Sequence, residues 1–192
     1  MSHVVYGCLM SVDRDQVLRS AAAQLTRKGS STLDEVAKAS GISRATLHRH
    51  FAGRDALVRA LEDLGLKECE LALDAARLGE GSAQDALRRL IKEIEPAAGL
   101  LAFLVTENQL FEGDDRHEGW SRIDDRMAEL FRRGQESGEF RIDLSTAWLT
   151  DALYGLVGAA AWAVLDGRVA AKDFSYMIAE LLIGGAQRRV ES

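Results

Sequence analysis

Proline, strand-forming patterns and aromatic residues are all scarce in this chain. Among its 192 residues there is one proline, Pro96, and aromatic residues make up only 6%. No stretch alternates apolar and polar residues in the way that a half-buried β-strand requires. Long segments rich in alanine, leucine, glutamate and arginine run uninterrupted instead, and these residues favour helix. With 47% hydrophobic residues to fill an interior, the sequence predicts an all-α protein.

Cysteine is nearly absent as well, since only Cys8 and Cys69 occur and neither belongs to a Cys-x-x-Cys motif. A disulfide between them stays open, but isolated thiols without a signal peptide are typical of a reducing cytosol. Residues 1–12 include several apolar side chains, yet they have no basic start and are too short for a signal peptide or a membrane span. We therefore expect a flexible tail over 1–12, no membrane association and a cytoplasmic protein.

The formal net charge of −6 is distributed unevenly. Residues 1–58 hold eight cations and five anions, whereas the remainder holds sixteen cations and twenty-five anions, so the two parts carry +3 and −9. His3, His48 and His50, three of the four histidines, also lie in the cationic part. A small basic module on a larger acidic body indicates that only one end of the protein faces phosphate.

Apolar residues recur at helical spacing along most of the chain, and glycines or capping residues separate the segments. Thr32 and Glu35 form the Thr-x-x-Glu pattern of a capping box, and Ser43 is a favoured N-cap. Pro96 suits an early helical position after a break. We expect about nine helices, over 13–28, 32–40, 43–50, 54–78, 83–95, 97–111, 117–137, 145–166 and 173–189.

The most informative stretch is 32–51, where two predicted helices are each too short to be stable alone. Ala37 is small where the helices would cross, and Gly41 permits a sharp turn four residues later. Ile42 fills the corner, and Leu47 packs the second helix from beneath. This arrangement is typical of a helix-turn-helix, whose second helix enters the DNA major groove.

The side chains that the second helix would expose support the helix-turn-helix hypothesis. Residues 43–50 contain neither aspartate nor glutamate, which a solvated face of an acidic protein would more often carry. Arginine can bind guanine with two hydrogen bonds, and serine or threonine can donate to phosphate or to base edges. Arg54 and the free N–H groups of the helix that it opens suit a phosphate. The alternative is a braced helical hairpin with no nucleic-acid role.

The stretch from Arg14 to Leu61 resembles the DNA-binding domain of the TetR/AcrR family. That family shows a paired alanine, a threonine-led second helix, and then Gly-Val-Ser-x-x-Thr-Leu-Tyr-x-His-Phe and x-Lys-x-x-Leu. The matching positions here are Ala21-Ala22, Thr32, Ala37, Gly41-Ile42-Ser43, Thr46-Leu47, His50-Phe51 and Arg54-Asp55-Ala56-Leu57. His48 replaces the family's usual tyrosine and Arg54 its lysine, and both replacements can still donate to phosphate. A family-like Ser-Gly-Glu-Phe-Arg also occurs over 137–141.

The resemblance implies a helix-turn-helix domain over 13–61, joined by a long helix to an effector-binding and dimerisation domain over 62–192. It also implies a ligand-responsive transcriptional regulator, in its common mode a repressor released from a palindromic operator by a small molecule. The expected DNA contacts are Thr32, Ser43, Arg44, Thr46, His48, Arg49, His50 and Arg54.

The last two helices suit a homodimer interface. The segment 148–164 interleaves glycine and alanine with leucine and valine, and small residues permit close helix approach. Helices 145–166 and 173–189 of two subunits could therefore form a four-helix interface. The alternative is that these faces are buried in the subunit's own core.

A small-molecule effector site is harder to place, because aromatic residues at helical spacing are more often core. Glu107 is an isolated polar residue in an apolar segment, suited either to a cationic or hydroxylated ligand or to solvent. The candidate lining residues are Phe103, Glu107, Phe111, Trp120, Met127, Phe131, Trp148, Tyr154 and Trp162.

No enzyme motif is present: Gly-x-Ser-x-Gly, His-Glu-x-x-His and a phosphate-binding glycine loop are all missing. His48 and His50 stand two residues apart, so on one helix they diverge and chelate metal poorly. Asp114-x-x-His117 occurs once, whereas a helical di-metal site needs paired motifs. We expect no catalytic residue, metal or cofactor. Two rival functions stay open: a constitutive DNA-binding repressor without a ligand, and a helical adaptor for a protein partner.

Overall fold

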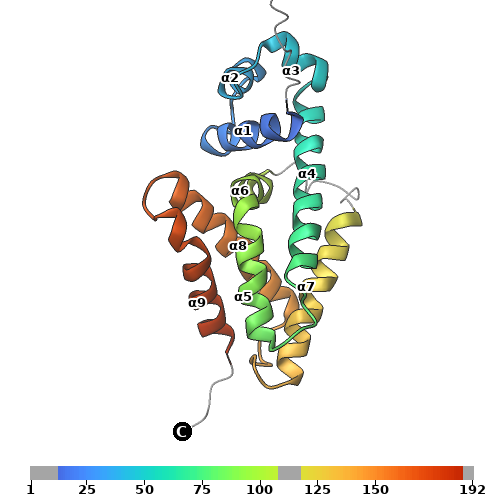
Figure 1. Ribbon diagram of the computed structural model, residues 1–192, viewed down its shortest axis with the longest axis vertical. Helices are drawn as coiled ribbons and strands as arrows, with labels where there is room; N and C mark the ends of the chain where they lie inside the picture. Colours follow the sequence, from blue (N-terminus) through green and yellow to red (C-terminus); the bar gives the residue numbers. More distant parts are fainter. Residues whose placement is uncertain (1–12, 108–117, 188–192) are drawn as a thin grey trace, which may run out of the picture.

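The computed structural model describes residues 13–107 and 118–187, and apart from one isolated β-bridge its regular structure there is helical. Helices α1, α2 and α3 gather at one end, and α4 runs from that end into a body formed by the remaining helices (Figure 1). The predicted all-α fold is confirmed. In chain order the helices are α1 (Arg14–Arg27), α2 (Leu33–Ala39), α3 (Arg44–His50), α4 (Arg54–Ala75), α5 (Ala83–Ile94), α6 (Ala98–Thr106), α7 (Glu118–Glu136), α8 (Thr146–Leu165) and α9 (Phe174–Ala186).

The helix starts at the end formed by α1, α2 and α3 follow the capping residues in the sequence. The predicted capping box is present: the Glu35 N–H donates to Thr32 Oγ1 (3.3 Å), and the Thr32 N–H donates to Glu35 Oε2 (2.8 Å). Ser43 Oγ accepts from the Thr46 N–H at 3.1 Å and so caps α3. These contacts satisfy backbone donors that a helix start leaves without partners.

The helix predicted over 97–111 is shorter than expected, and this prediction was wrong at its C-terminal end. Pro96 lies in a short 3-10 turn, Glu95–Ala97, that leads into α6. The helix then ends at Thr106, because Glu107 leaves the helical conformation with a ψ of 101°. The other boundaries differ by up to three residues, and the largest differences are at the ends of α4 (Ala75 instead of 78) and α9 (Ala186 instead of 189).

One continuous cluster of buried side chains joins the two ends of the molecule. It includes Leu18 of α1, Leu61 of α4 and Leu104 of α6, each at most 2% exposed. Helix α6 packs beneath α1 and against α8, so it contacts both the end formed by α1–α3 and the body (Figure 1). The packing therefore gives α6 the position of a connector between the two ends.

The corner between α7 and α8 explains the Ser-Gly-Glu-Phe-Arg segment. Gly138 has a φ of +77°, a conformation that glycine adopts without strain. Phe140 is fully buried against Phe131, with ring centroids 5.7 Å apart. A Cβ on Gly134 would lie 2.1 Å from the Phe140 ring, so only glycine permits this approach. Glu139 Oε1 and Oε2 accept the N–H groups of Ala83 (3.1 Å) and Gln84 (3.0 Å) at the start of α5.

Replacing Glu139 with glutamine should destabilise the protein by about 1 kcal/mol at neutral pH, the usual cost of a lost helix cap. Partial burial opposes ionisation of Glu139, but hydrogen bonds from the Gln84 and Ala83 N–H groups outweigh it and lower its pKa. A lowered pKa stabilises the fold above the unfolded-state pKa of about 4.3, and this contribution is lost as pH falls through the folded-state value. Urea unfolding of the parent and Glu139→Gln should therefore give free energies that converge at acid pH.

The control for this measurement is Glu136→Gln, which removes an exposed carboxylate that pairs only with Arg132 among the described residues. This control should lower the free energy of unfolding by less than Glu139→Gln does at neutral pH. A gap between the parent and Glu139→Gln that stays constant from neutral to acid pH would refute the capping role.

Helix α8 is the one helix in the described residues that is long and apolar enough to cross a membrane by length and composition. Its buried residues pack against α6, α7 and α9, a position that also accounts for an apolar helix. Its outer face carries Trp148, Asp151, Gly155 and Ala159, which are exposed.

Candidate nucleic-acid interface and body cavity

The helix-turn-helix is built as the sequence predicts. Gly41 has a φ of +68°, and the Ile42 N–H donates to the Ala37 carbonyl at 3.0 Å, which closes the turn between α2 and α3. Leu47 (1% exposed) and Phe51 (2%) anchor α3 from beneath. The opposite side of α3 is therefore turned away from the core and is fixed in orientation.

The outward side of α3 carries hydrogen-bond donors of several lengths. Five of these donors are exposed and Thr46 is half-buried; the exposed ones are Ser43, Arg44, His48, Arg49 and His50. Ser43 and Thr46 hydroxyls lie 2.8 Å apart, and Arg49 Nη2 donates to Thr46 Oγ1 at 3.1 Å. These contacts hold the Arg49 side chain along α3, toward Thr46.

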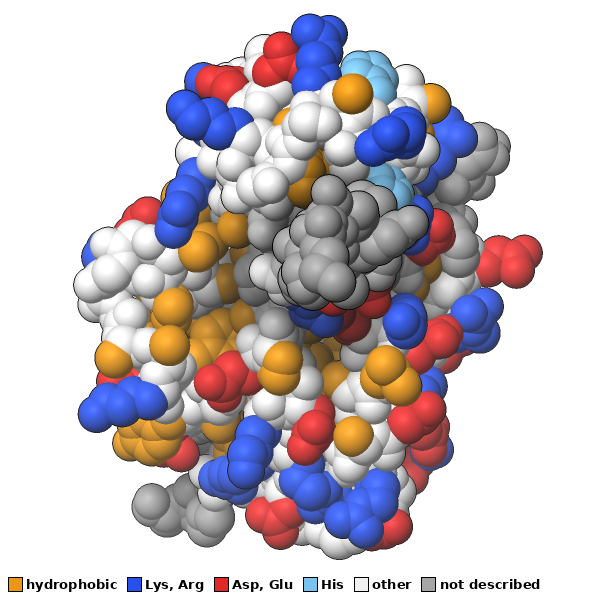
Figure 2. Space-filling model, turned by 45° about the horizontal axis from the view of Figure 1, so that its top comes forward, with side chains coloured by type: hydrophobic (Ala, Val, Ile, Leu, Met, Phe, Trp, Pro, Cys, Tyr) orange, Lys and Arg blue, Asp and Glu red, His pale blue; other side chains and the backbone are white. Residues whose placement is uncertain are grey.

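Basic side chains gather at this end of the molecule. Figure 2 shows lysine and arginine side chains and the histidines over the end that carries α2 and α3, beside a smaller acidic cluster. Arg44 Nε pairs with Asp34 Oδ1 at 3.0 Å, but both side chains are more than half exposed. An exposed pair contributes about 0–1 kcal/mol, so Arg44 can exchange Asp34 for another partner at little cost.

Arg54, at the start of α4, connects the end formed by α1–α3 to the body. Its Nη1 donates to the Ser31 carbonyl (3.5 Å), and its Nη2 donates to Glu107 Oε2 (3.4 Å) at the end of α6. The Glu107 side chain is 12% exposed and that of Arg54 is 34% exposed. The carboxylate is thus largely removed from water, and Arg54 is its ion-pair partner among the described residues.

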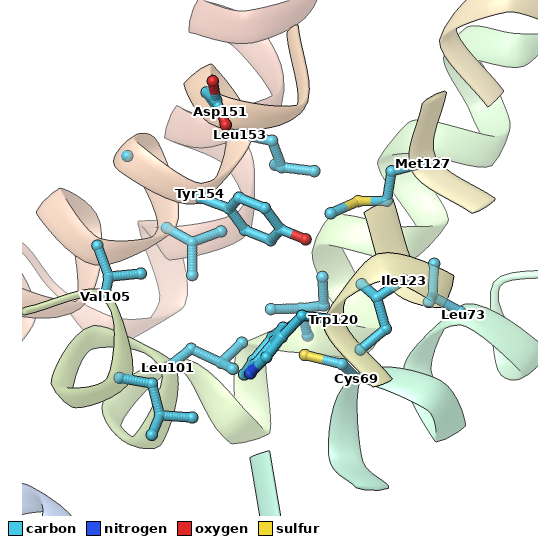
Figure 3. Close-up of a pocket in the computed structure, with 14 residues that line it drawn as sticks. Cys69, Leu73, Leu101, Val105, Trp120, Ile123, Met127, Asp151, Leu153 and Tyr154 are labelled. Carbon is cyan, nitrogen blue, oxygen red and sulfur yellow. The ribbon is translucent and has the colours of Figure 1, made fainter. Parts of the chain in front are cut away.

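A cavity of about 300 Å³ lies inside the body, between α4, α5, α6, α7 and α8 (Figure 3). Its wall is mostly aliphatic, and no lysine, arginine or histidine is among its described lining residues. Among the described lining residues Asp151 is the one charged residue, and it lies at the exposed outer side of α8. The lining residues are Cys69, Leu73, Ile94, Leu101, Leu104, Val105, Trp120, Ile123, Met127, Asp151, Leu153, Tyr154, Gly155 and Val157.

Two carboxylates behind the wall hold the aromatic lining residues in place. Trp120 Nε1 donates to Glu62 Oε1 at 2.9 Å, and Glu62 is itself 9% exposed. The Tyr154 hydroxyl donates to Asp124 Oδ1 at 2.8 Å. Both polar aromatic atoms therefore point toward acidic groups rather than standing unpaired in the cavity.

Cys69 lines the same cavity, and burial is the main reason that its thiol stays protonated. Loss of solvent, with smaller contributions from the charges of Glu68 and Glu70, raises the pKa of Cys69 to about 12. A thiol with this pKa is a poor nucleophile at neutral pH and acts here as an apolar wall group.

Comparison with known proteins places this arrangement in a family. The model for bacterial regulatory proteins of the tetR family matches residues 17–61, the helix-turn-helix and the start of α4. The HTH-type transcriptional regulator NfxB of Pseudomonas aeruginosa is 33% identical over 180 residues, which cover 93% of this chain and 96% of NfxB. The chain belongs to the TetR family. It is a DNA-binding transcriptional regulator.

Other TetR-family proteins share the fold over nearly the whole chain. The repressor LfrR of Mycolicibacterium smegmatis is 23% identical over 154 residues, covering 80% of each chain. A crystal structure of LfrR in complex with proflavine matches with a TM-score of 0.72 over 92% of this chain and 97% of LfrR. PfmR of Thermus thermophilus matches with a TM-score of 0.67 over 92% of this chain and 100% of PfmR. The curated relatives are transcriptional regulators rather than enzymes.

The TetR-family residues predicted to contact DNA are brought together at one end. Ser43, Arg44, His48, Arg49 and His50 share the outward side of α3 with half-buried Thr46, and exposed Thr32 stands at the start of α2. Arg54 opens α4 on the same domain, but its guanidinium also faces Glu107.

The residues predicted to line the effector site are scattered. Only Trp120, Met127 and Tyr154 line the cavity. Phe103 and Phe131 are buried in the core, Trp148 is 58% exposed on the outside of α8, and Trp162 is half-buried away from the cavity. Glu107 faces neither cavity nor solvent, because α6 ends before it and its carboxylate lies beside Arg54. Phe111 lies outside the described residues, as do Asp114 and His117.

Most of the cavity wall is not predictable, because leucine, isoleucine and valine at helical spacing look the same in sequence whether they face a cavity or a core. One signal is present in the sequence: Asp151 is the single charged residue of α8. No group of three or more His, Cys, Asp or Glu side chains within 13–107 and 118–187 lies close enough to hold a metal ion.

Proposed function

We propose that this TetR-family protein is a cytoplasmic repressor that binds a palindromic operator as a homodimer and is released by a small molecule in the body cavity. The observation that carries the proposal is the combination of a donor-rich, rigidly braced α3 with a cavity that shares α6 with the DNA-binding end. Residues 13–61 form the DNA-binding domain in this proposal, and residues 62–192 form the effector-binding and dimerisation domain. The proflavine complex of LfrR, a relative, supports the role of the body.

In this proposal α3 lies in the major groove. Arg44 exchanges Asp34 for a base edge, and Thr46 and Arg49 contact bases or the adjacent backbone. Ser43, His48, His50 and Thr32 donate to phosphates that flank the groove, and Arg54 with the N–H groups at the start of α4 holds a further phosphate. A constitutive repressor without a ligand would need no cavity, and the cavity therefore favours ligand control.

The test is to sequence the duplex fragments that the purified protein retains from sheared genomic DNA, with and without small-molecule extract of the cells. We expect a shared inverted repeat with half-sites about 34–36 Å apart, and weaker retention with extract. Retention without any shared sequence would contradict the operator assignment. Binding that barely responds to salt would favour the adaptor function instead.

The dimer is assigned to the outer faces of α8 and α9, the segments 145–166 and 173–189. Trp148 of α8 and Tyr176 and Leu181 of α9 are each more than half exposed. Gly155 and Gly184 stand on the same helices, and the space where a side chain would begin is open at both, which would let two helices approach closely. Exposed large apolar side chains grouped on adjacent helices are typical of an oligomer interface.

Replacing Leu181 with aspartate should convert the dimer to monomers, because the change buries an unpaired charge in the interface. Analytical ultracentrifugation at micromolar concentration would measure the shift. Operator affinity should fall at least tenfold, since a monomer reads one half-site alone. The control is Leu71→Asp on α4, which is equally exposed (59% against 66%) but lies outside α8 and α9. If Leu181→Asp stays dimeric, the interface does not lie on the outer face of α9.

We infer that α6 transmits the ligand signal. Leu101, Leu104 and Val105 line the cavity, and Glu107 pairs with Arg54 within a turn of them. A ligand that displaces α6 therefore displaces the partner of the arginine that opens α4. Moving this link changes the orientation of α3 relative to α3 of the other subunit, which weakens operator binding.

A further inference from the structure

An ion pair joins α1, the base of the helix-turn-helix, to the long helix α4. We propose that its two members, Arg19 and Glu68, are positioning residues for operator binding. Their contact fixes the inclination of α1 on α4, and with it the separation of the two α3 helices in the dimer. This inference rests on the proposed function, a homodimer on a palindromic operator, and adds the residues that set the half-site spacing.

Helix α1 carries the helix-turn-helix on the body. It packs against α4 and α6, while α2 packs against α1 and α3 packs against α2 (Figure 1). The inclination of α1 on α4 therefore decides where α3 lies relative to the body and to the partner subunit. Apolar packing is non-directional and defines such an inclination weakly, whereas a charged pair with defined geometry favours one arrangement.

The Arg19 and Glu68 side chains meet through two pairs of atoms. Arg19 Nη1 donates to Glu68 Oε2 at 3.1 Å, and Arg19 Nη2 forms an ion pair with Glu68 Oε1. The Glu68 side chain is 12% exposed, and its Oε1 is shielded from water. A guanidinium that contacts both oxygens of a carboxylate is directional, and low exposure limits competition from water. The geometry therefore suits a contact that holds two helices at one angle.

A second ion pair between the same two helices provides a comparison. Lys67 Nζ lies 3.7 Å from Asp15 Oδ2, and the two side chains are 64% and 46% exposed. A single long contact between exposed groups contributes little. Neither Arg19 nor Glu68 lines the cavity, so their pair can be removed without changing a residue of the proposed effector site. The positioning role is therefore assigned to Arg19 and Glu68 rather than to Asp15 and Lys67.

The experiment measures fluorescence anisotropy of two labelled duplexes with the full-length protein. One duplex carries the inverted repeat recovered from genomic fragments, and the other carries a single half-site. Glu68→Gln should weaken binding to the inverted repeat about tenfold and leave half-site affinity unchanged, because each α3 stays intact while the separation of the two is no longer fixed. Duplexes whose half-sites are one base pair closer or farther apart should then bind the variant nearly as well as the original spacing.

Control variants locate the effect in this one ion pair. Asp15→Asn removes the neighbouring pair and should keep the parent's ratio of inverted-repeat to half-site affinity. Arg19→Gln should lower the ratio as Glu68→Gln does, and the double variant should lower it no further, since both act through one contact. A ratio that Glu68→Gln leaves unchanged, or that Asp15→Asn lowers equally, would overturn the proposal. Equal weakening on both duplexes would also overturn it, since that result indicates damage to each helix-turn-helix.

The parent protein separates this inference from the proposed function. If the parent binds the half-site as tightly as the inverted repeat, the palindromic operator is wrong and this inference fails with it. If the parent prefers the inverted repeat and Glu68→Gln keeps that preference, the operator assignment stands and only the positioning role of Arg19 and Glu68 is wrong. The two ideas therefore fail through different measurements.

Discussion

Replacing Arg44 and Thr46 together with alanine is expected to weaken operator binding by roughly a hundredfold, because each lost base contact costs about 1–3 kcal/mol. Neither side chain is buried in the core, and the Ser43 cap of α3 needs only the Thr46 backbone, so the variant should fold. In this proposal the two side chains determine which operator sequence is bound as well as how tightly it is bound. Selection of binding sites from a random duplex pool should therefore give a relaxed consensus.

A matched control is Arg88→Ala, which removes an exposed arginine of α5, far from α3 in sequence and in the fold. It should leave both the affinity and the selected sites unchanged. The single variants are informative too, since Thr46 also holds Arg49 and its loss frees that side chain. If the double variant selects the parent's sites with the parent's affinity, α3 does not read the operator.

Replacing Glu107 with glutamine is expected to uncouple the cavity from the operator. Glutamine keeps the size of the side chain but removes the charge that holds Arg54, so movement of α6 no longer moves the start of α4. Couplings between sites are typically worth about 1–3 kcal/mol, a factor of roughly 5 to 150. The ratio of operator affinities without and with saturating small-molecule extract of the cells should fall from this range toward one.

The matched control is Glu70→Gln, which removes an exposed ion pair with Arg122 between α4 and α7 (2.9 Å). This control should keep the parent's ratio of operator affinities without and with ligand. Coupling is reciprocal, so Glu107→Gln should also abolish the effect of operator DNA on the affinity for the effector in that extract. An unchanged ratio in Glu107→Gln would show that α6 acts on α4 through apolar packing alone.

The helix-turn-helix is predictable from the sequence because its signals are local. A capping residue, a glycine with positive φ and a buried leucine each act within a few residues, as Thr32, Gly41 and Leu47 do here. The direction of α3 follows from them. The sequence therefore contains enough to place the donor-rich face, although it does not contain the base that each donor meets.

The cavity is less predictable because it depends on which apolar side chains fail to meet. Leu73 lines the cavity and Leu87 does not, yet both are at most 1% exposed and both lie on apolar faces of their helices. A single polar residue in an apolar helix is a useful criterion, but it fails at Glu107 because α6 ends before that residue. The same criterion applied to α8 identifies Asp151.

The low exposure of Glu107 also limits how TetR-family domains can be exchanged. A chimera that grafts another regulator's residues 13–61 onto this body must bring a cation to position 54. Without one, a largely buried carboxylate would lose its ion-pair partner, at a cost of about 1–3 kcal/mol. The lysine that the family usually carries there meets this condition. Operator specificity can therefore be changed through the residues of α3, whereas position 54 beneath it requires a cation opposite Glu107.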